Sequence, residues 1–95
     1  MPKTAKMGLS VRDKQHALQM LVGGCELGLK DFRKTGEKGN IVLIYSSLRD
    51  AKTLGLLSNV LKQVPPEVRK AWSGGLKDIK NPKEIFNMPR RLFPN

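Results

Sequence analysis

The residues most suited to catalysis in this 95-residue sequence are Asp13 and His16. They lie one helical turn apart, a spacing at which a carboxylate can orient an imidazole that acts as a general base. Hydrolysis by such a base also requires a nucleophile and oxyanion donors. Ser46-Ser47 lacks the Gly-x-Ser-x-Gly pattern of a nucleophile elbow, so we expect these serines to cap a helix. We therefore assign no catalytic residue and expect a protein that is not an enzyme.

Metal and cofactor sites are not indicated either. One Cys and one His fall short of the four ligands of a structural zinc, and Cys25 lies in an apolar helical stripe that favours an inert, buried thiol. Phosphate-binding fingerprints such as Gly-x-Gly-x-x-Gly are missing from the sequence. We expect no cofactor. A single cysteine forms no disulfide within the chain, and this fits a cytoplasmic location.

The charge is the strongest functional signal. Eighteen Lys and Arg against eight Asp and Glu give a formal charge of +10, which favours a polyanionic or acidic partner. The excess lies in residues 1–38 and 62–95, whereas residues 39–61 are nearly neutral. The longest apolar run, residues 41–45, is far shorter than the ~20 residues of a membrane span, and no signal peptide is recognisable. We expect no membrane partner.

The basic residues of the expected folded part form two groups, one at the end of the first helix and one near the C-terminus. In the second group, Lys77, Lys80 and Lys83 recur at every third position, so that they could line one helical face and track phosphates. We expect the following residues to form a basic strip: Lys30, Arg33, Lys34, Arg69, Lys70, Lys77, Lys80 and Lys83. Few aromatic residues are available to stack on single-stranded bases, so direct contact with nucleic acid would be non-specific and sensitive to salt.

The first half of the sequence predicts a helical hairpin. Ser10-Val11-Arg12-Asp13 is a helix start of the capping-box type, and apolar residues follow it at spacings of three and four as far as Phe32. Gly24-x-x-x-Gly28 within this stretch allows a second helix to approach closely, but a bend near Gly23-Gly24 is an equal alternative. Gly36-Glu37-Lys38-Gly39 matches the Gly-x-x-Gly loop of KH domains, yet no sheet accompanies it, and a plain turn is favoured.

The second half predicts further helices. Residues 41–45 suit either a buried strand or a helix. We favour a helix capped by Asn40 that continues towards Gln63, with a break at Ser46-Ser47 as an option. Pro65-Pro66 ends it and starts a short helix through Trp72.

Asn81-Pro82-Lys83-Glu84 starts another helix, to which Ile85-Phe86 would add buried side chains. The predicted fold is all-α: a hairpin of two longer helices with short C-terminal helices and an extended basic tail. We divide the chain into a basic arm (1–9), one small helical domain (10–87) and a docking tail (88–95).

The C-terminal tail combines prolines, two arginines and two large apolar side chains, as docking peptides do. We expect partner binding by Pro89, Arg90, Arg91, Leu92 and Phe93, with Trp72 beside them. The alternative is that Leu92 and Phe93 pack on the protein's own core. Isomerisation of X–Pro bonds is slow without a catalyst, which makes a host prolyl isomerase a candidate accessory partner at Pro65, Pro66 or Pro89.

A short, strongly basic chain that lacks a catalytic set and ends in Arg90-Arg91-Leu92-Phe93 resembles the small host-takeover proteins of temperate phages. The resemblance is to the anti-RecBCD proteins, which inhibit or redirect that host helicase–nuclease. It implies a non-enzymatic modulator in the host cytoplasm that binds a host complex acting on DNA, protects phage DNA ends and affects recombination. The alternatives are a direct, largely non-sequence-specific nucleic-acid-binding protein and a small RNA-associated protein.

Overall fold

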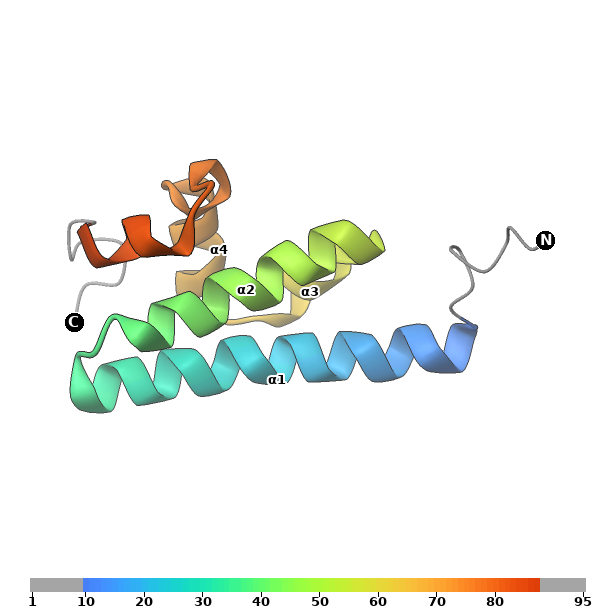
Figure 1. The fold of residues 1–95 in the computed structure, drawn as a ribbon. Helices are drawn as coiled ribbons and strands as arrows, with labels where there is room; N and C mark the ends of the chain where they lie inside the picture. The colour runs from blue at the N-terminus through green and yellow to red at the C-terminus, as the bar shows by residue number, and fades with distance from the viewer. Residues whose placement is uncertain (1–9, 88–95) are drawn as a thin grey trace.

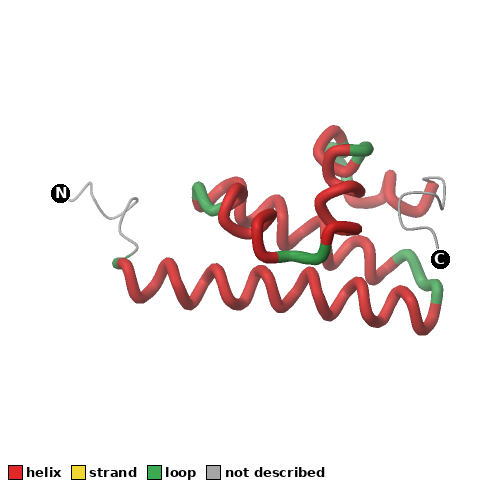
Figure 2. The backbone as a smooth tube through the Cα atoms, turned by 180° about the vertical axis from the view of Figure 1, so that it is seen from behind, coloured by secondary structure: helices red, strands yellow, loops and turns green. Residues whose placement is uncertain are grey.

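Two antiparallel helices form the base of the fold, and shorter helices cover them (Figure 1). The computed structural model describes residues 10–87, and within this range every regular element is helical (Figure 2). The predicted all-α hairpin is therefore confirmed. The elements are α1 (Val11–Thr35), α2 (Gly39–Leu54), α3 (Leu57–Gln63), α4 (Pro66–Ser73) and the 3-10 helices η2 (Leu76–Asp78) and η3 (Pro82–Asn87).

Helix α1 begins and ends where the sequence predicts. The backbone N–H of Asp13 donates to Ser10 Oγ at 3.1 Å, so Ser10 caps the helix. Gly36 ends it in the left-handed region, with φ of 72°, and its N–H donates to the carbonyl of Phe32. A side chain other than glycine would be strained at this φ. The first helix and the turn after it are thus specified by local sequence.

The glycines inside α1 allow close packing and do not bend the helix. A Cβ added to Gly28 would lie 2.8 Å from the carbonyl oxygen of Asn40 and 2.8 Å from Cγ1 of Ile44. A Cβ added to Gly24 would lie 2.6 Å from Oγ of Ser47. Of the two alternatives for Gly24-x-x-x-Gly28, the close approach of a second helix is confirmed, because α1 is continuous and α2 lies against both glycines.

The start of α2 differs from the prediction. Residues 41–45 are helical, as favoured, but Asn40 is not the cap. Lys38 occupies the cap position, but its side chain makes no capping hydrogen bond to the start of α2. The side-chain amide of Asn40 donates to Thr35 Oγ1 at 3.1 Å and to the carbonyl of Glu37 at 3.2 Å. Asn40 therefore stabilises the turn from α1, because α1 is close enough to provide an acceptor.

The predicted helix from residue 41 towards Gln63 is divided at Gly55 into α2 and α3, so its predicted continuity was wrong. The optional break at Ser46-Ser47 was wrong as well, because α2 runs through both serines. Gly55 adopts a φ of 75°, and the N–H of the following Leu56 donates to the carbonyl of Ala51 at 2.8 Å. Ser47 is only 8% exposed and lies within α2 against Gly24. Contact with α1 holds the two serines in a helix that their local preference for caps would interrupt.

The prolines and the last cap act as predicted. Helix α3 ends at Gln63, Pro66 occupies the first turn of α4, and the described peptide bonds are all trans. Asn81 and Glu84 form reciprocal caps: Lys83 N–H donates to Asn81 Oδ1 at 2.9 Å, and Asn81 N–H donates to Glu84 Oε2 at 3.1 Å. The helix they start is the 3-10 helix η3.

Ile85 is fully buried, as predicted, but Phe86 is 55% exposed, so its predicted burial was wrong. The two adjacent side chains of this short helix leave it in different directions, and only Ile85 faces the core.

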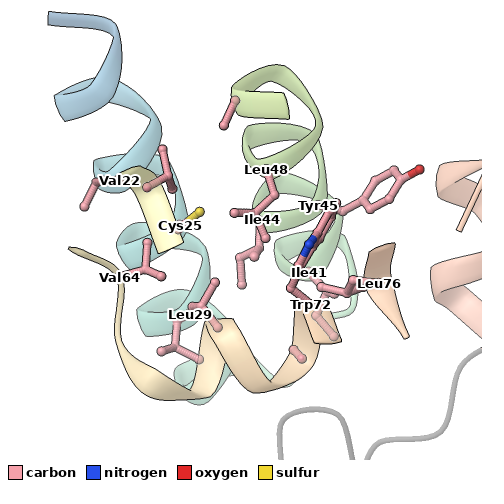
Figure 3. Packing of buried hydrophobic residues seen from close by; sticks show 14 of the residues in the cluster. Val22, Cys25, Leu29, Ile41, Ile44, Tyr45, Leu48, Val64, Trp72 and Leu76 are labelled. Carbon is pink, nitrogen blue, oxygen red and sulfur yellow. The ribbon is translucent and has the colours of Figure 1, made fainter. Parts of the chain in front are cut away.

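Helix α2 is the centre of the core. Figure 3 shows Cys25 and Leu29 of α1 on one side of it, near Ile44 and Leu48, whereas Tyr45 points away from α1. The opposite side of α2 is covered by the C-terminal segment, which contributes the buried residues Leu76, Ile79 and Ile85. Removing a large apolar side chain from water stabilises the fold by ~1.5–3 kcal/mol. Within residues 10–87, none of the helices is long and apolar enough to span a membrane.

Candidate functional site

The two reactive side chains considered in the sequence, Cys25 and His16, lie in different environments on α1. Cys25 is fully buried in the core, and desolvation, followed by the charge of Glu26, raises the pKa of its thiol to about 12. His16 is exposed on α1, and no hydrogen bond joins it to Asp13. Across residues 10–87, no three His, Cys, Asp or Glu side chains are grouped to hold a metal ion.

Of the residues predicted to bind a partner, only Trp72 lies in the described part of the chain. Pro89, Arg90, Arg91, Leu92 and Phe93 fall outside it. The Trp72 side chain is 6% exposed and belongs to the core cluster. Its ring is therefore part of the packing between α4 and the rest of the fold, and it is not available at the surface.

Two members of the predicted basic strip have partners within the protein. The guanidinium of Arg33 forms an ion pair with Glu67, which joins the end of α1 to the start of α4. Arg69 donates to the carbonyls of Leu61 and Val64, both at 3.0 Å. Arg69 thereby closes the end of α3, where Pro65 and Pro66 supply no N–H groups. These arginines stabilise the fold in addition to adding charge.

Lys77, Lys80 and Lys83 do not line one helical face, so this prediction was wrong. Helix η2 ends at Asp78, Ile79 is extended, and η3 begins only at Pro82. The helical periodicity assumed for the three lysines is therefore interrupted between Asp78 and Pro82. Lys77 and Lys80 nevertheless line the same groove. The remaining members of the strip, Lys30, Lys34, Lys70 and Lys83, are exposed.

The groove lies between the C-terminal half of α2 and the segment 77–80, and has a volume of about 570 Å³. Four of its side chains are cationic and one is anionic. We call it the basic groove. It is lined by Arg49, Lys52, Thr53, Lys77, Asp78, Ile79 and Lys80.

A buried hydrogen bond holds the two walls of the basic groove together. The hydroxyl of Tyr45 on α2 donates to the carbonyl of Ile79 at 2.5 Å. Nη1 of Arg49 donates to the same hydroxyl at 2.5 Å, and the guanidinium lies 5.5 Å from the centre of the Tyr45 ring. A cation over an aromatic face and a charge-assisted hydrogen bond both favour this arrangement. The backbone at Ile79 is therefore fixed relative to α2.

Arg49 and Lys52 were missed by the sequence analysis, which placed them in the nearly neutral central segment. Their spacing of three residues puts them on one side of α2. That spacing was visible in the sequence, but the lysines that face them are 25 to 31 positions further along the chain. Only the folding of segment 77–80 onto α2 brings the four cations together.

A second, apolar hollow lies between α1 and the end of α2, with a volume of about 340 Å³. Met20 is 65% exposed and Leu54 is 43% exposed. We call this the apolar hollow. Its lining residues are Ala17, Met20, Leu21, Asp50, Thr53 and Leu54.

The aromatic rings provide little surface for stacking. Phe32, Tyr45 and Trp72 are buried, which leaves Phe86 as the exposed aromatic residue among residues 10–87. Comparison of the chain with family models, curated proteins and solved structures finds no match. The basic groove and the apolar hollow are therefore the two surface features that bear on function.

Proposed function

We propose that this protein is a non-enzymatic modulator that binds a protein machine acting on DNA, of the helicase–nuclease type, and inhibits or redirects it. In this proposal the chain aids phage DNA protection and recombination in a host cell. The supporting observation is the apolar hollow with Met20 and Leu54 exposed on it. Exposed apolar side chains that border a hollow are typical of protein-binding surfaces, and Met is enriched at such interfaces.

The charge and the buried rings agree with a protein partner of this class. An acidic surface on such a partner would complement the charge of +10 on this chain, and complementary charge raises the rate of association. Reading of single-stranded bases normally uses exposed aromatic side chains, whereas Tyr45 and Trp72 are buried. The tail residues from Pro89 to Phe93 remain a proposed second contact with this partner. A prolyl isomerase remains a proposed accessory partner.

The test measures the degradation of linear duplex DNA by a purified RecBCD-type helicase–nuclease with and without this protein. We expect the wild-type protein to slow degradation or to change its products. The variant M20Q/L54Q should weaken this effect about tenfold, because two side chains of the apolar contact are lost. L27Q is the matched control, since Leu27 is 52% exposed on α1 and lies outside the hollow.

Two results would count against the modulator. Degradation that is unchanged by wild-type protein at any concentration contradicts the proposed activity. If M20Q/L54Q and L27Q weaken the effect on DNA degradation equally, the apolar hollow has no special role in binding. A chain truncated after Asn87 tests the tail separately: unchanged inhibition by this chain would show that residues 88–95 are not required.

A second candidate function is direct, largely non-sequence-specific binding of nucleic acid. The observation that favours it is the charge of the described residues, in which fourteen Lys and Arg accompany eight Asp and Glu. Gel shifts with duplex DNA, single-stranded DNA and RNA at several salt concentrations test it. We expect the logarithm of the binding constant to fall steeply and linearly with the logarithm of salt concentration. Binding that is absent even at low salt would contradict this function.

A further inference from the structure

We propose that the basic groove is a binding site for the phosphate backbone of a polynucleotide. This inference rests on the second candidate function and names the surface that would carry it. The observation that supports it is a cluster of four cations in one groove. Two of them lie on α2 and two on the segment after α4: Arg49, Lys52, Lys77 and Lys80. The sequence alone did not predict that the two pairs of cations face each other.

The charges in the groove are not balanced by the protein. Asp78 is the one carboxylate among its lining residues. Lys52, Lys77 and Lys80 form no ion pair with any residue between 10 and 87, and Arg49 uses its guanidinium on neutral oxygens. Like charges that converge on a groove raise the energy of the free protein, and a bound polyanion relieves this repulsion.

The groove is also preorganised. Its two walls are joined by the hydrogen bond from Tyr45 to the carbonyl of Ile79, and Arg49 is held on the Tyr45 hydroxyl. Because the backbone is already fixed, a ligand needs to order only the lysine side chains, which lowers the cost of binding.

The lining of the groove favours nucleic acid over an acidic protein. Its one apolar residue, Ile79, is buried in the core, so the groove lacks an exposed apolar contact at which a protein could anchor. Protein–protein interfaces are depleted in Lys, whereas interfaces with DNA are strongly positive and polar. The lining contains no aromatic ring. We therefore expect contact with phosphates without base reading, and duplex binding at least as tight as single-strand binding.

The test compares two double variants that lose the same charge. K52Q/K77Q removes one lysine from each wall of the groove, and K14Q/K62Q removes two exposed lysines outside it. Lys52 and Lys62 each lie in the last turn of a helix, so these two substitutions lose similar interactions with the helix dipole. The probe is a short blunt DNA duplex, and its dissociation constant is measured over a series of salt concentrations.

We expect K52Q/K77Q to bind the duplex at least about tenfold more weakly than wild type at low salt. The slope of log affinity against log salt should become shallower by about 2, because each lost phosphate contact reduces its magnitude by about 0.9. K14Q/K62Q should retain the wild-type slope. In NMR spectra of the wild-type protein, the amides of Thr53 and Ile79 should shift on addition of duplex, and this measurement does not depend on any variant.

Three results would overturn the inference. If both double variants lose the same affinity and slope, the groove is not the site, although nucleic-acid binding itself stands. If a polyglutamate peptide displaces the duplex at equal charge concentration, the groove takes acidic protein. If wild-type protein does not bind duplex at low salt, the second candidate function fails together with this inference. Thermal unfolding of each variant verifies that the fold is retained.

Discussion

Gly28 on α1 and Ile44 on α2 approach each other so closely that no side chain fits between the helices at this point. A Cβ on Gly28 would lie 2.8 Å from Cγ1 of Ile44 and at the same distance from the backbone oxygen of Asn40. A flexible side chain could yield, but the backbone of α2 cannot move without separating the hairpin. Gly28 is thus the position at which the sequence sets the distance between the two main helices.

The first prediction compares Gly28→Ala with Gly23→Ala. Alanine at Gly28 forces α2 away from α1, and we expect a loss of about 1–3 kcal/mol in the free energy of unfolding. Gly23 has open space around it, so alanine there should stabilise the protein by about 0.5–1 kcal/mol through helix propensity. Chemical denaturation measures both. Equal effects at the two positions would show that the close approach does not limit the packing.

The second prediction concerns the hydroxyl of Tyr45. Tyr45→Phe leaves the ring in the core but removes the donor to the carbonyl of Ile79 and the acceptor for Arg49. We expect a loss of about 1–3 kcal/mol, as for other buried hydrogen bonds, and faster hydrogen exchange at residues 77–80. Thr53→Ala, which removes an exposed hydrogen bond on the same helix, is the control. A stable variant with unchanged exchange would contradict the role of the hydroxyl in fixing the groove.

The third prediction is a pH dependence at Glu67. A hydrogen bond from its own backbone N–H, and then the side chain of Arg33, hold the pKa of this carboxyl below its ordinary value of 4.5. The ionised form is thus favoured in the folded state. Its contribution to stability is complete above pH 4.5 and is lost as the pH falls through the lowered pKa.

Glu67→Gln should therefore be less stable than wild type near neutral pH, and the difference should shrink in acid. Arg33→Gln should remove part of the same pH dependence, because it lacks the partner of Glu67. Denaturation curves at several pH values and salt concentrations measure this. The loss of stability should be smaller than that caused by Gly28→Ala or Tyr45→Phe. It should also weaken with salt, since the side chains of Arg33 and Glu67 are both exposed. A difference that grows in acid would contradict the proposed sign.

The fourth prediction concerns Cys25. Burial raises the pKa of its thiol from 9.0 to about 12, which lowers the thiolate fraction near neutral pH about 1,000-fold. We expect alkylation by iodoacetamide at least about 100-fold slower in the folded protein than in denaturant, since the thiolate is the reactive form. Between pH 9 and about 12 the unfolded chain ionises first, so stability falls as pH rises in that range. Rapid labelling of the folded protein would contradict the buried position.

Local sequence was sufficient to predict most of the helix boundaries. Ser10 and Gly36 delimit α1, and Pro66 begins α4, because caps, left-handed glycines and prolines act over one helical turn. The choice of helix over strand for residues 41–45 was also correct, since no second strand was available to pair with them. The buried, unreactive Cys25 followed from its place in the apolar stripe of α1.

The helical class, most of the caps and the excess of positive charge follow from the sequence alone, because each of these depends on neighbouring residues or on composition. Packing between helices explains why α2 continues through Ser46-Ser47 to Leu54, because α1 packs against Ser47. It also placed Trp72 in the core and Lys77 and Lys80 opposite Arg49. These contacts join residues that are far apart in the chain. The conformational preference of a residue does not specify which distant side chain it will contact.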